Sequence, residues 1–117
     1  MDALRAVWIT ASGGIDTAVM LPTDPVLALL GLIGHASSTT LTALDQLAVV
    51  ELTPALSMWT STELGGHPSL CATKVAAAFG HRNLVCGTAV FTGRLDAEKN
   101  PTSLTGAQAR HLRDLAQ

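Results

Sequence analysis

Charged residues are scarce in this chain, and aromatic residues are scarcer still. Charged residues make up 14% of the sequence, against about 25% in an average soluble protein. Tyr is absent, and there are only two Phe and two Trp. A concentrated basic surface with stacking aromatics, which nucleic-acid binding usually requires, is therefore not expected. Uncharged apolar surface is usually covered by another molecule, so this composition favours a homo-oligomer, in its simplest form a homodimer.

Long hydrophobic runs and a targeting segment are missing as well. The most apolar run, PVLALLGLIG, has ten residues, whereas a membrane-spanning helix needs about 20. The start MDALRAVWIT lacks the basic residues, apolar stretch and cleavage site of a signal peptide. We therefore expect a cytoplasmic protein with no membrane contact, in which Cys71 and Cys86 stay reduced and pack as small buried hydrophobes.

Catalytic and metal-binding motifs are not recognisable. The sequence contains no GxSxG, no GxGxxG and no pair of carboxylates at helical spacing. His67 with Cys71, and His81 with Cys86, supply the residue types of a zinc site. Neither cysteine belongs to a CxxC pair, however, so buried thiols and surface histidines are the favoured interpretation. We expect no enzyme activity, no cofactor and no bound metal.

The few charges are unevenly distributed along the chain. Residues 6–73 contain five acidic residues and no Lys or Arg, whereas six basic and three acidic residues follow from Lys74 onward. Such a division predicts an acidic face that meets a basic face, either within a dimer or on a partner protein. The densest cluster is the segment RLDAEKNP, a solvated loop by its composition, which supplies four candidate binding residues: Arg94, Asp96, Glu98 and Lys99.

Turn and capping signals divide the chain into eight elements. Strands are expected at residues 4–11, 15–21, 46–52, 55–62 and within 83–93. Helices are expected after Asp24 and Pro25, over residues 69–79, and after Thr105, which forms a capping box with Gln108. The order β-β-α-β-β-α-β-α predicts a single α+β domain over residues 1–117, with an antiparallel-rich sheet and the helices on one face. Gly87 and Gly93 are expected to bracket a closely packed central strand.

Two further features concern possible binding sites. Trp8 and Trp59 fit the core or the face of a hairpin, but Trp is also enriched among interface anchors. Trp59 is therefore a candidate binding residue. A pocket between the sheet and the helices, near His67 and the LGG segment at residues 64–66, is the alternative, and it would hold a small ligand.

The last third of the chain resembles a known family. GTAVFTG, followed after a polar loop by TSLTGAQ, is similar to the C-terminal signature of a small protein family that is catalogued as a domain of unknown function. Members of this family occur in phages, plasmids and bacterial genomes. RAV at residues 5–7 and LGG at residues 64–66 belong to the same correspondence. Relatives tend to carry Asn before the middle helix, where this chain has Thr73 and Lys74, so a ligand role of that Asn does not carry over. The resemblance implies the order of elements and a mobile-element context, and it supplies no catalytic residue.

Together these patterns favour a small non-enzymatic binding protein of phage or mobile-element type. It would act through protein–protein contacts in the host cytoplasm and modulate a host factor. The alternative function is the binding of a nucleotide or metabolite in a pocket between sheet and helices.

Overall fold

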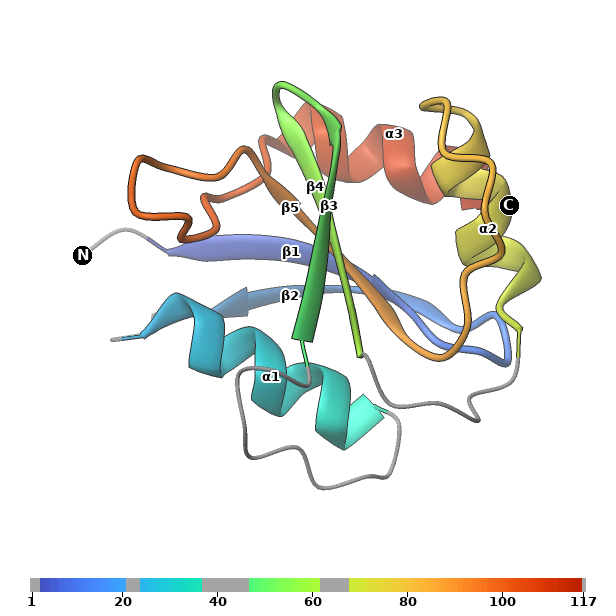
Figure 1. The fold of residues 1–117 in the computed structure, drawn as a ribbon, viewed down its shortest axis with the longest axis horizontal. Helices are drawn as coiled ribbons and strands as arrows, with labels where there is room; N and C mark the ends of the chain where they lie inside the picture. The colour runs from blue at the N-terminus through green and yellow to red at the C-terminus, as the bar shows by residue number, and fades with distance from the viewer. Residues whose placement is uncertain (1–2, 21–23, 37–46, 62–67, 117) are drawn as a thin grey trace.

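The computed structural model describes residues 3–20, 24–36, 47–61 and 68–116. Within these ranges the chain forms a five-stranded antiparallel sheet with the strand order β2-β1-β5-β4-β3. Two hairpins supply four of the strands, and the last strand of the chain joins them in the centre (Figure 1). The strands are β1 (Leu4–Ile9), β2 (Ile15–Met20), β3 (Leu47–Thr53), β4 (Leu56–Ser61) and β5 (Ala89–Gly93).

A glycine-containing turn closes the first hairpin. The Thr10 N–H donates to the Gly14 carbonyl at 2.8 Å, and the Gly13 N–H donates to the Thr10 carbonyl at 3.0 Å. Gly13 has a φ of 95°, which lies in the left-handed region that glycine enters without steric cost. The turn joins β1 and β2 in the register that pairs Leu4 with Met20 and Ile9 with Ile15.

Side-chain caps mark where the helices begin. Asp24 Oδ1 accepts a hydrogen bond from the Leu27 N–H at 3.2 Å at the start of α1 (Pro25–Ala36). Ser69 caps α2 (Leu70–Ala77). Both arms of the predicted capping box are present at α3 (Gly106–Ala116), where the Thr105 N–H donates to Gln108 Oε1 at 2.9 Å and the Gln108 N–H donates to Thr105 Oγ1 at 3.1 Å.

The sheet carries helices on both faces. α2 and α3 cover the face that includes Val7, Met58 and Phe91, and α1 covers the opposite face, which includes Trp59 and Val90. Figure 1 shows α3 at the top and α2 at the right of the view, with α1 below the sheet. The predicted order of elements is confirmed, whereas the predicted placement of the helices on one face is wrong. Because the central strands are apolar on both faces, each face requires a cover.

No helix in the described ranges is long and apolar enough to cross a membrane. α1 has 12 residues, none of them charged. Its side chains at Leu29 and Ile33 are buried against the sheet, while Leu27 on its outer side is 49% exposed. α1 therefore completes the core on one face and leaves apolar surface on the outside of the molecule.

β5 is the closely packed central strand, and all five of its residues are buried. It is shorter than predicted, because residues 83–88 lie outside it. Gly87 has a φ of 75°, so it is required by the backbone conformation. Gly93 is required by packing, since a Cβ there would lie 2.7 Å from the Ser103 carbonyl oxygen. The central strand predicted between these two glycines is confirmed.

The close approach at Gly93 leads to a stability prediction. We expect Gly93→Ala to lower the free energy of unfolding by about 1–3 kcal/mol, because the added methyl group would meet a backbone oxygen so closely that the backbone would have to shift. Gly31→Ala is the matched control: a Cβ at this position in α1 would meet no atom within 4 Å beyond its chain neighbours and the backbone of its own helix, so alanine should raise stability by about 0.5–1 kcal/mol. Chemical denaturation of the two variants checks this, and equal effects would contradict it.

Candidate functional site

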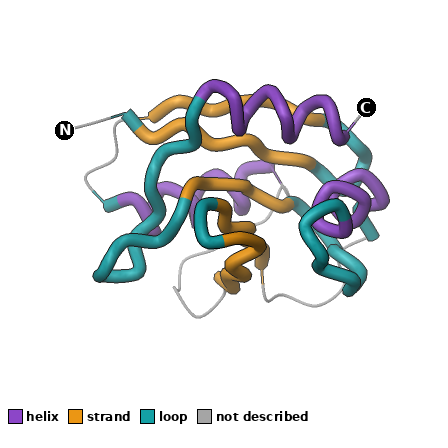
Figure 2. Tube along the Cα trace, turned by 90° about the horizontal axis from the view of Figure 1, so that it is seen from above, coloured by secondary structure: helices purple, strands orange, loops and turns teal. Residues whose placement is uncertain are grey.

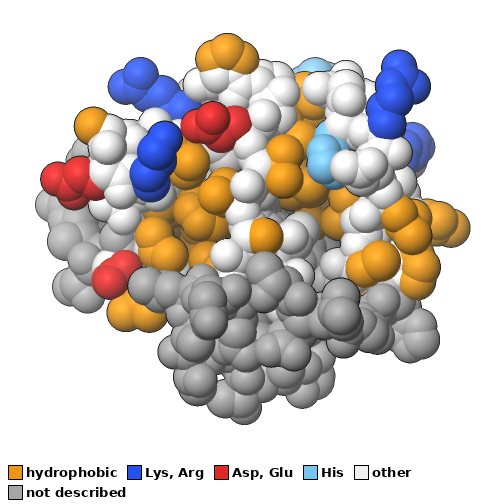
Figure 3. All heavy atoms as spheres, in the orientation of Figure 1, with side chains coloured by type: hydrophobic (Ala, Val, Ile, Leu, Met, Phe, Trp, Pro, Cys, Tyr) orange, Lys and Arg blue, Asp and Glu red, His pale blue; other side chains and the backbone are white. Residues whose placement is uncertain are grey.

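The four charged candidates from the sequence lie together in one exposed segment after β5. We call residues 94–101 the charged loop. Arg94, Asp96, Glu98 and Lys99 are all exposed, and Figure 2 shows the segment projecting beyond the sheet before it returns to the start of α3. In Figure 3, basic and acidic side chains gather on the left of the molecule, where this loop lies.

The base of the charged loop is fastened to the core. Leu95 and Pro101 form an antiparallel bridge; Pro101 is buried, and Leu95 packs against the apolar cluster beneath α1. The Arg94 carbonyl accepts hydrogen bonds from the Thr102 N–H at 3.2 Å and from Thr102 Oγ1 at 2.7 Å. The loop is therefore closed like a hairpin, and its ends are held in place by both backbone and side-chain contacts.

The tip of the loop is shaped by the carboxylate of Asp96. Asp96 Oδ1 accepts hydrogen bonds from the N–H groups of Glu98 and Asn100, both at 2.9 Å. Asp and Asn side chains commonly form such turns with the backbone two residues further on. Asp96 therefore positions the loop, and the outward charges at its tip and base come from Arg94, Glu98 and Lys99. Sequence reasoning grouped Asp96 with these residues and missed its backbone role.

Lys99 has a φ of 66°, the one positive φ at a non-glycine residue in the described part of the chain. The Asp96 N–H donates to the Asn100 carbonyl at 2.9 Å, and the Lys99 N–H donates to the Asp96 carbonyl at 3.0 Å. These two bonds repeat the pattern of the turn at Thr10–Gly14, where Gly13 takes the left-handed position. A side chain in this conformation costs about 1–2 kcal/mol, so Lys99 occupies a place where glycine would be more stable.

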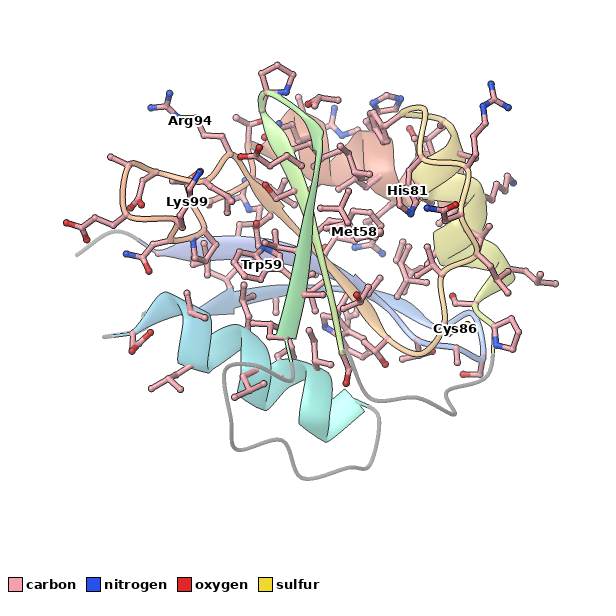
Figure 4. All side chains as sticks on the ribbon, viewed as in Figure 1. Met58, Trp59, His81, Cys86, Arg94 and Lys99 are labelled. Atoms are coloured by element: carbon pink, nitrogen blue, oxygen red, sulfur yellow. The ribbon has the colours of Figure 1, made fainter. Side chains whose placement is uncertain are left out.

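Trp59 lies beneath the charged loop and belongs to the core. Its side chain is 4% exposed, and its Nε1 donates a hydrogen bond to Thr92 Oγ1 at 2.8 Å. Trp59 and Leu95 share the same apolar cluster, and in Figure 4 Trp59 lies over the sheet while Arg94 and Lys99 lie further out on the left. The core interpretation of Trp59 is confirmed. The alternative of an exposed interface anchor is wrong, because the side chain is enclosed between the sheet and its cover.

A buried hydroxyl lies on the same face of the sheet. Ser57 faces Thr92 across β4 and β5, and its side chain is fully buried. Its Oγ has no hydrogen-bond partner in the described structure. Because a buried hydroxyl normally finds a partner, Ser57 Oγ stands out as an unsatisfied polar atom among the described residues.

The candidate metal and pocket residues lie only partly within the described structure. His67 and residues 64–66, which define the predicted ligand pocket, lie outside the described residues. Cys71 is half-buried and Cys86 is exposed, and both are free thiols. Burial of Cys86 was therefore predicted wrongly, because this residue precedes β5 and pairs only with Pro68 in an isolated bridge. The described residues, His81 included, contain no group of three His, Cys, Asp or Glu able to hold a metal ion.

Comparisons with known proteins do not add a relative. No protein-family model, curated protein or solved structure matches this chain. Its function has to be inferred from the placement of its own residues.

The strain at Lys99 can be measured directly. We expect Lys99→Gly to raise the free energy of unfolding by about 0.5–1 kcal/mol, because relief of about 1–2 kcal/mol of strain exceeds the stabilisation of the unfolded chain by glycine. Glu98→Gly is the control: Glu98 has no positive φ, so glycine should lower stability by about 0.5–1 kcal/mol. Denaturant midpoints distinguish the two signs, and a destabilised Lys99→Gly variant would contradict the strain.

The polar pair beneath the loop provides a second test. Thr92→Val should cost about 1–3 kcal/mol, because the buried Trp59 indole N–H loses its acceptor. Ser57→Ala should leave stability within about 1 kcal/mol of the parent protein or above it, since it removes a hydroxyl without a partner. Thermal and chemical unfolding of both variants would show the difference. A larger loss for Ser57→Ala would mean that the Ser57 hydroxyl is hydrogen-bonded in solution.

Proposed function

We propose that the protein is a small non-enzymatic binding protein that contacts a partner protein through the charged loop. The observation that carries this proposal is Lys99 in a left-handed conformation, in a turn where the equivalent position of the first hairpin is Gly13. Strained residues cluster at functional sites, where stability is given up for another purpose. A role of the Lys99 ammonium group outside the fold would explain a lysine at this position.

The shape of the loop suits recognition of another protein. Its tip is held by the Asp96 carboxylate and its base by Leu95 and Pro101, so little conformational entropy would be lost on binding. Arg94 and Lys99 present positive charge, with Glu98 beside them. Such a surface fits a partner with acidic groups opposite Arg94 and Lys99 and one basic group opposite Glu98. Electrostatic complementarity of this kind favours fast and specific association.

The biological setting of the proposal comes from the resemblance to phage, plasmid and bacterial sequences. We propose that the partner is a host protein in the cytoplasm and that binding modulates it. The segregation of acidic and basic residues along the chain agrees with a binding role.

Binding of a small ligand is the second candidate function, and the buried Ser57 hydroxyl is the observation that favours it. A nucleotide or metabolite that supplies the missing hydrogen bond on the α1 side of the sheet would stabilise the folded state. A thermal-shift screen tests this candidate. A ligand that raises the melting temperature of the parent protein, but not that of Ser57→Ala, would support it, and no stabilisation by any compound would count against it.

Quantitative capture from a bacterial lysate tests the binding function. We expect the parent protein to retain a partner that the double variant Arg94→Ala with Lys99→Gly loses at least tenfold, because two charged contacts are removed while the loop keeps its conformation. Arg110→Ala is the control, since Arg110 is an exposed residue of α3 and should leave capture unchanged. The captured amount should also fall as salt is raised.

Two results of this experiment would overturn the proposal. One is a partner that the double variant and the parent protein retain equally, because binding would then use another surface. The other is the absence of any captured protein together with a mass increase of a few hundred daltons in native mass spectrometry, which would favour the small-ligand alternative.

A further inference from the structure

β3 forms one edge of the sheet, on the side opposite β2. The outward backbone N–H and C=O groups of such an edge can pair with another strand, and proteins usually protect edges with Lys, Pro or bulges. Leu47 to Val50 carry no charge and no proline, and the irregularity of β3 comes only between Glu51 and Thr53. In Figure 3, which has the view of Figure 1 with β3 in front, hydrophobic side chains lie on both sides of the centre.

The side chains of β3 make this edge apolar on both faces. Val49 lies opposite Trp59 on the α1 side and is 40% exposed. Val50 and Leu52 lie on the other side and pack only partly against the core beneath α2 and α3. Glu51 is the one charged residue of the strand. An apolar edge of this kind, in a chain with few charges, is the part of the described surface most suited to another strand.

The opposite edge is obstructed. In β2 the Asp16 side chain accepts a hydrogen bond from the Thr17 N–H at 2.8 Å, so a carboxylate occupies a backbone donor that a pairing strand would need. Arg113 of α3 also reaches Thr17 Oγ1 at 3.3 Å. In the described structure no side chain forms a hydrogen bond with the backbone of β3 from Leu47 to Leu52. The two edges therefore differ in their ability to accept a strand.

We propose that two copies of this chain pair through β3, antiparallel and about a two-fold axis. This interface is separate from the charged loop and does not depend on the proposed function. Paired residues must lie on the same face of a continuous sheet, so the axis passes midway between the two copies of one residue. The regular stretch Leu47–Glu51 has Val49 at its centre. Val49 then faces the partner's Val49, and each Glu51 faces the partner's Leu47.

Charge disfavours a register centred on Glu51. An axis at Glu51 would place two carboxylates directly opposite each other, and like charges at such positions destabilise a strand pair. With the axis at Val49, the charged side chains lie at the two ends of the paired stretch, and the middle is formed by Ala48, Val49 and Val50 from both copies. The exposed Val49 side chains would cover each other on the α1 face.

The size of the surface sets the expected strength. A seven-residue strand is about 24 Å long, and with α1 packed about 10 Å away the strip is roughly 20 Å deep, or about 500 Å² per copy. Weak and transient interfaces bury less than about 600 Å² per partner. We therefore expect a reversible dimer with a dissociation constant in the micromolar range or weaker, and not an obligate one.

Sedimentation equilibrium of the full chain from about 1 µM to 1 mM tests the inference. We expect the mean mass to rise toward twice 12.1 kDa with concentration, and Val49→Lys to weaken dimerisation at least tenfold while leaving the circular dichroism spectrum unchanged. Val19→Lys is the matched control, because Val19 is 61% exposed on the opposite edge strand. A parent protein that stays monomeric, or a Val49→Lys variant that dimerises normally, would overturn the proposal.

Cysteine cross-linking tests the register without relying on a lysine. In a background of Cys71→Ser with Cys86→Ser, Val49→Cys should form a covalent dimer on mild oxidation, because directly opposed Cα atoms lie about 4.5–5.5 Å apart, within the range of a disulfide. Val19→Cys should not. The double variant Arg94→Ala with Lys99→Gly should dimerise normally. If the parent protein stays monomeric and captures a host protein that Val49→Lys no longer captures, the β3 edge would pair with a strand of that host protein. This result would overturn the proposed dimer.

Discussion

Burial of β5 on both faces is the constraint on which the rest of the structure depends. Val90 contributes to the cluster beneath α1, and Phe91 contributes to the cluster beneath α2 and α3. Neither face can be left to water, so the helices are divided between them. The returning segment also has to pass directly over Gly93, where the Ser103 carbonyl occupies the space of a side chain. Residues 94–101 are thereby confined to a closed hairpin that projects from the end of the central strand.

Two five-residue turns in the described part of the chain share one backbone pattern but differ in the residue at the left-handed position. At Thr10–Gly14 glycine takes the left-handed position, and in the charged loop lysine takes the equivalent position with the same pair of backbone hydrogen bonds. The fold can therefore make this turn with glycine. Lys99 therefore carries backbone strain that glycine at the same position would relieve. The Asp96 carboxylate and the packing of Leu95 maintain the loop despite that strain.

The charged loop and the edge of β3 are different kinds of surface. The loop presents charges on a rigid support, which favours specificity and rate of association, whereas the β3 edge presents backbone groups between apolar side chains. Pairing through β3 would leave both loops of a dimer free. Two loops on one assembly would bind a partner with two matching sites more tightly than one loop alone, provided that the spacing allows both to engage.

Local signals in the sequence were sufficient for the order of the elements. Asp24 and Pro25 mark the start of α1, and Thr105 and Gln108 mark the start of α3. The segment Ser12–Gly14 marks the turn of the first hairpin. Each of these signals acts over four residues or fewer, so it can be recognised in the sequence. The clustering of Arg94, Glu98 and Lys99 was likewise visible, since neighbours in sequence share one loop. These features depend on chain geometry that does not change with the tertiary environment.

Only the tertiary structure decided the remaining features. The face covered by α1, the burial of Trp59 against Thr92 and the edge position of β3 all depend on contacts between residues far apart in the sequence. An apolar strand can be covered by any apolar helix, so its sequence does not say which helix covers it or on which side. The left-handed conformation of Lys99 and the backbone role of Asp96 follow from the closure of the loop by Leu95 and Pro101. That closure exists because the chain on both sides of it is packed against β5.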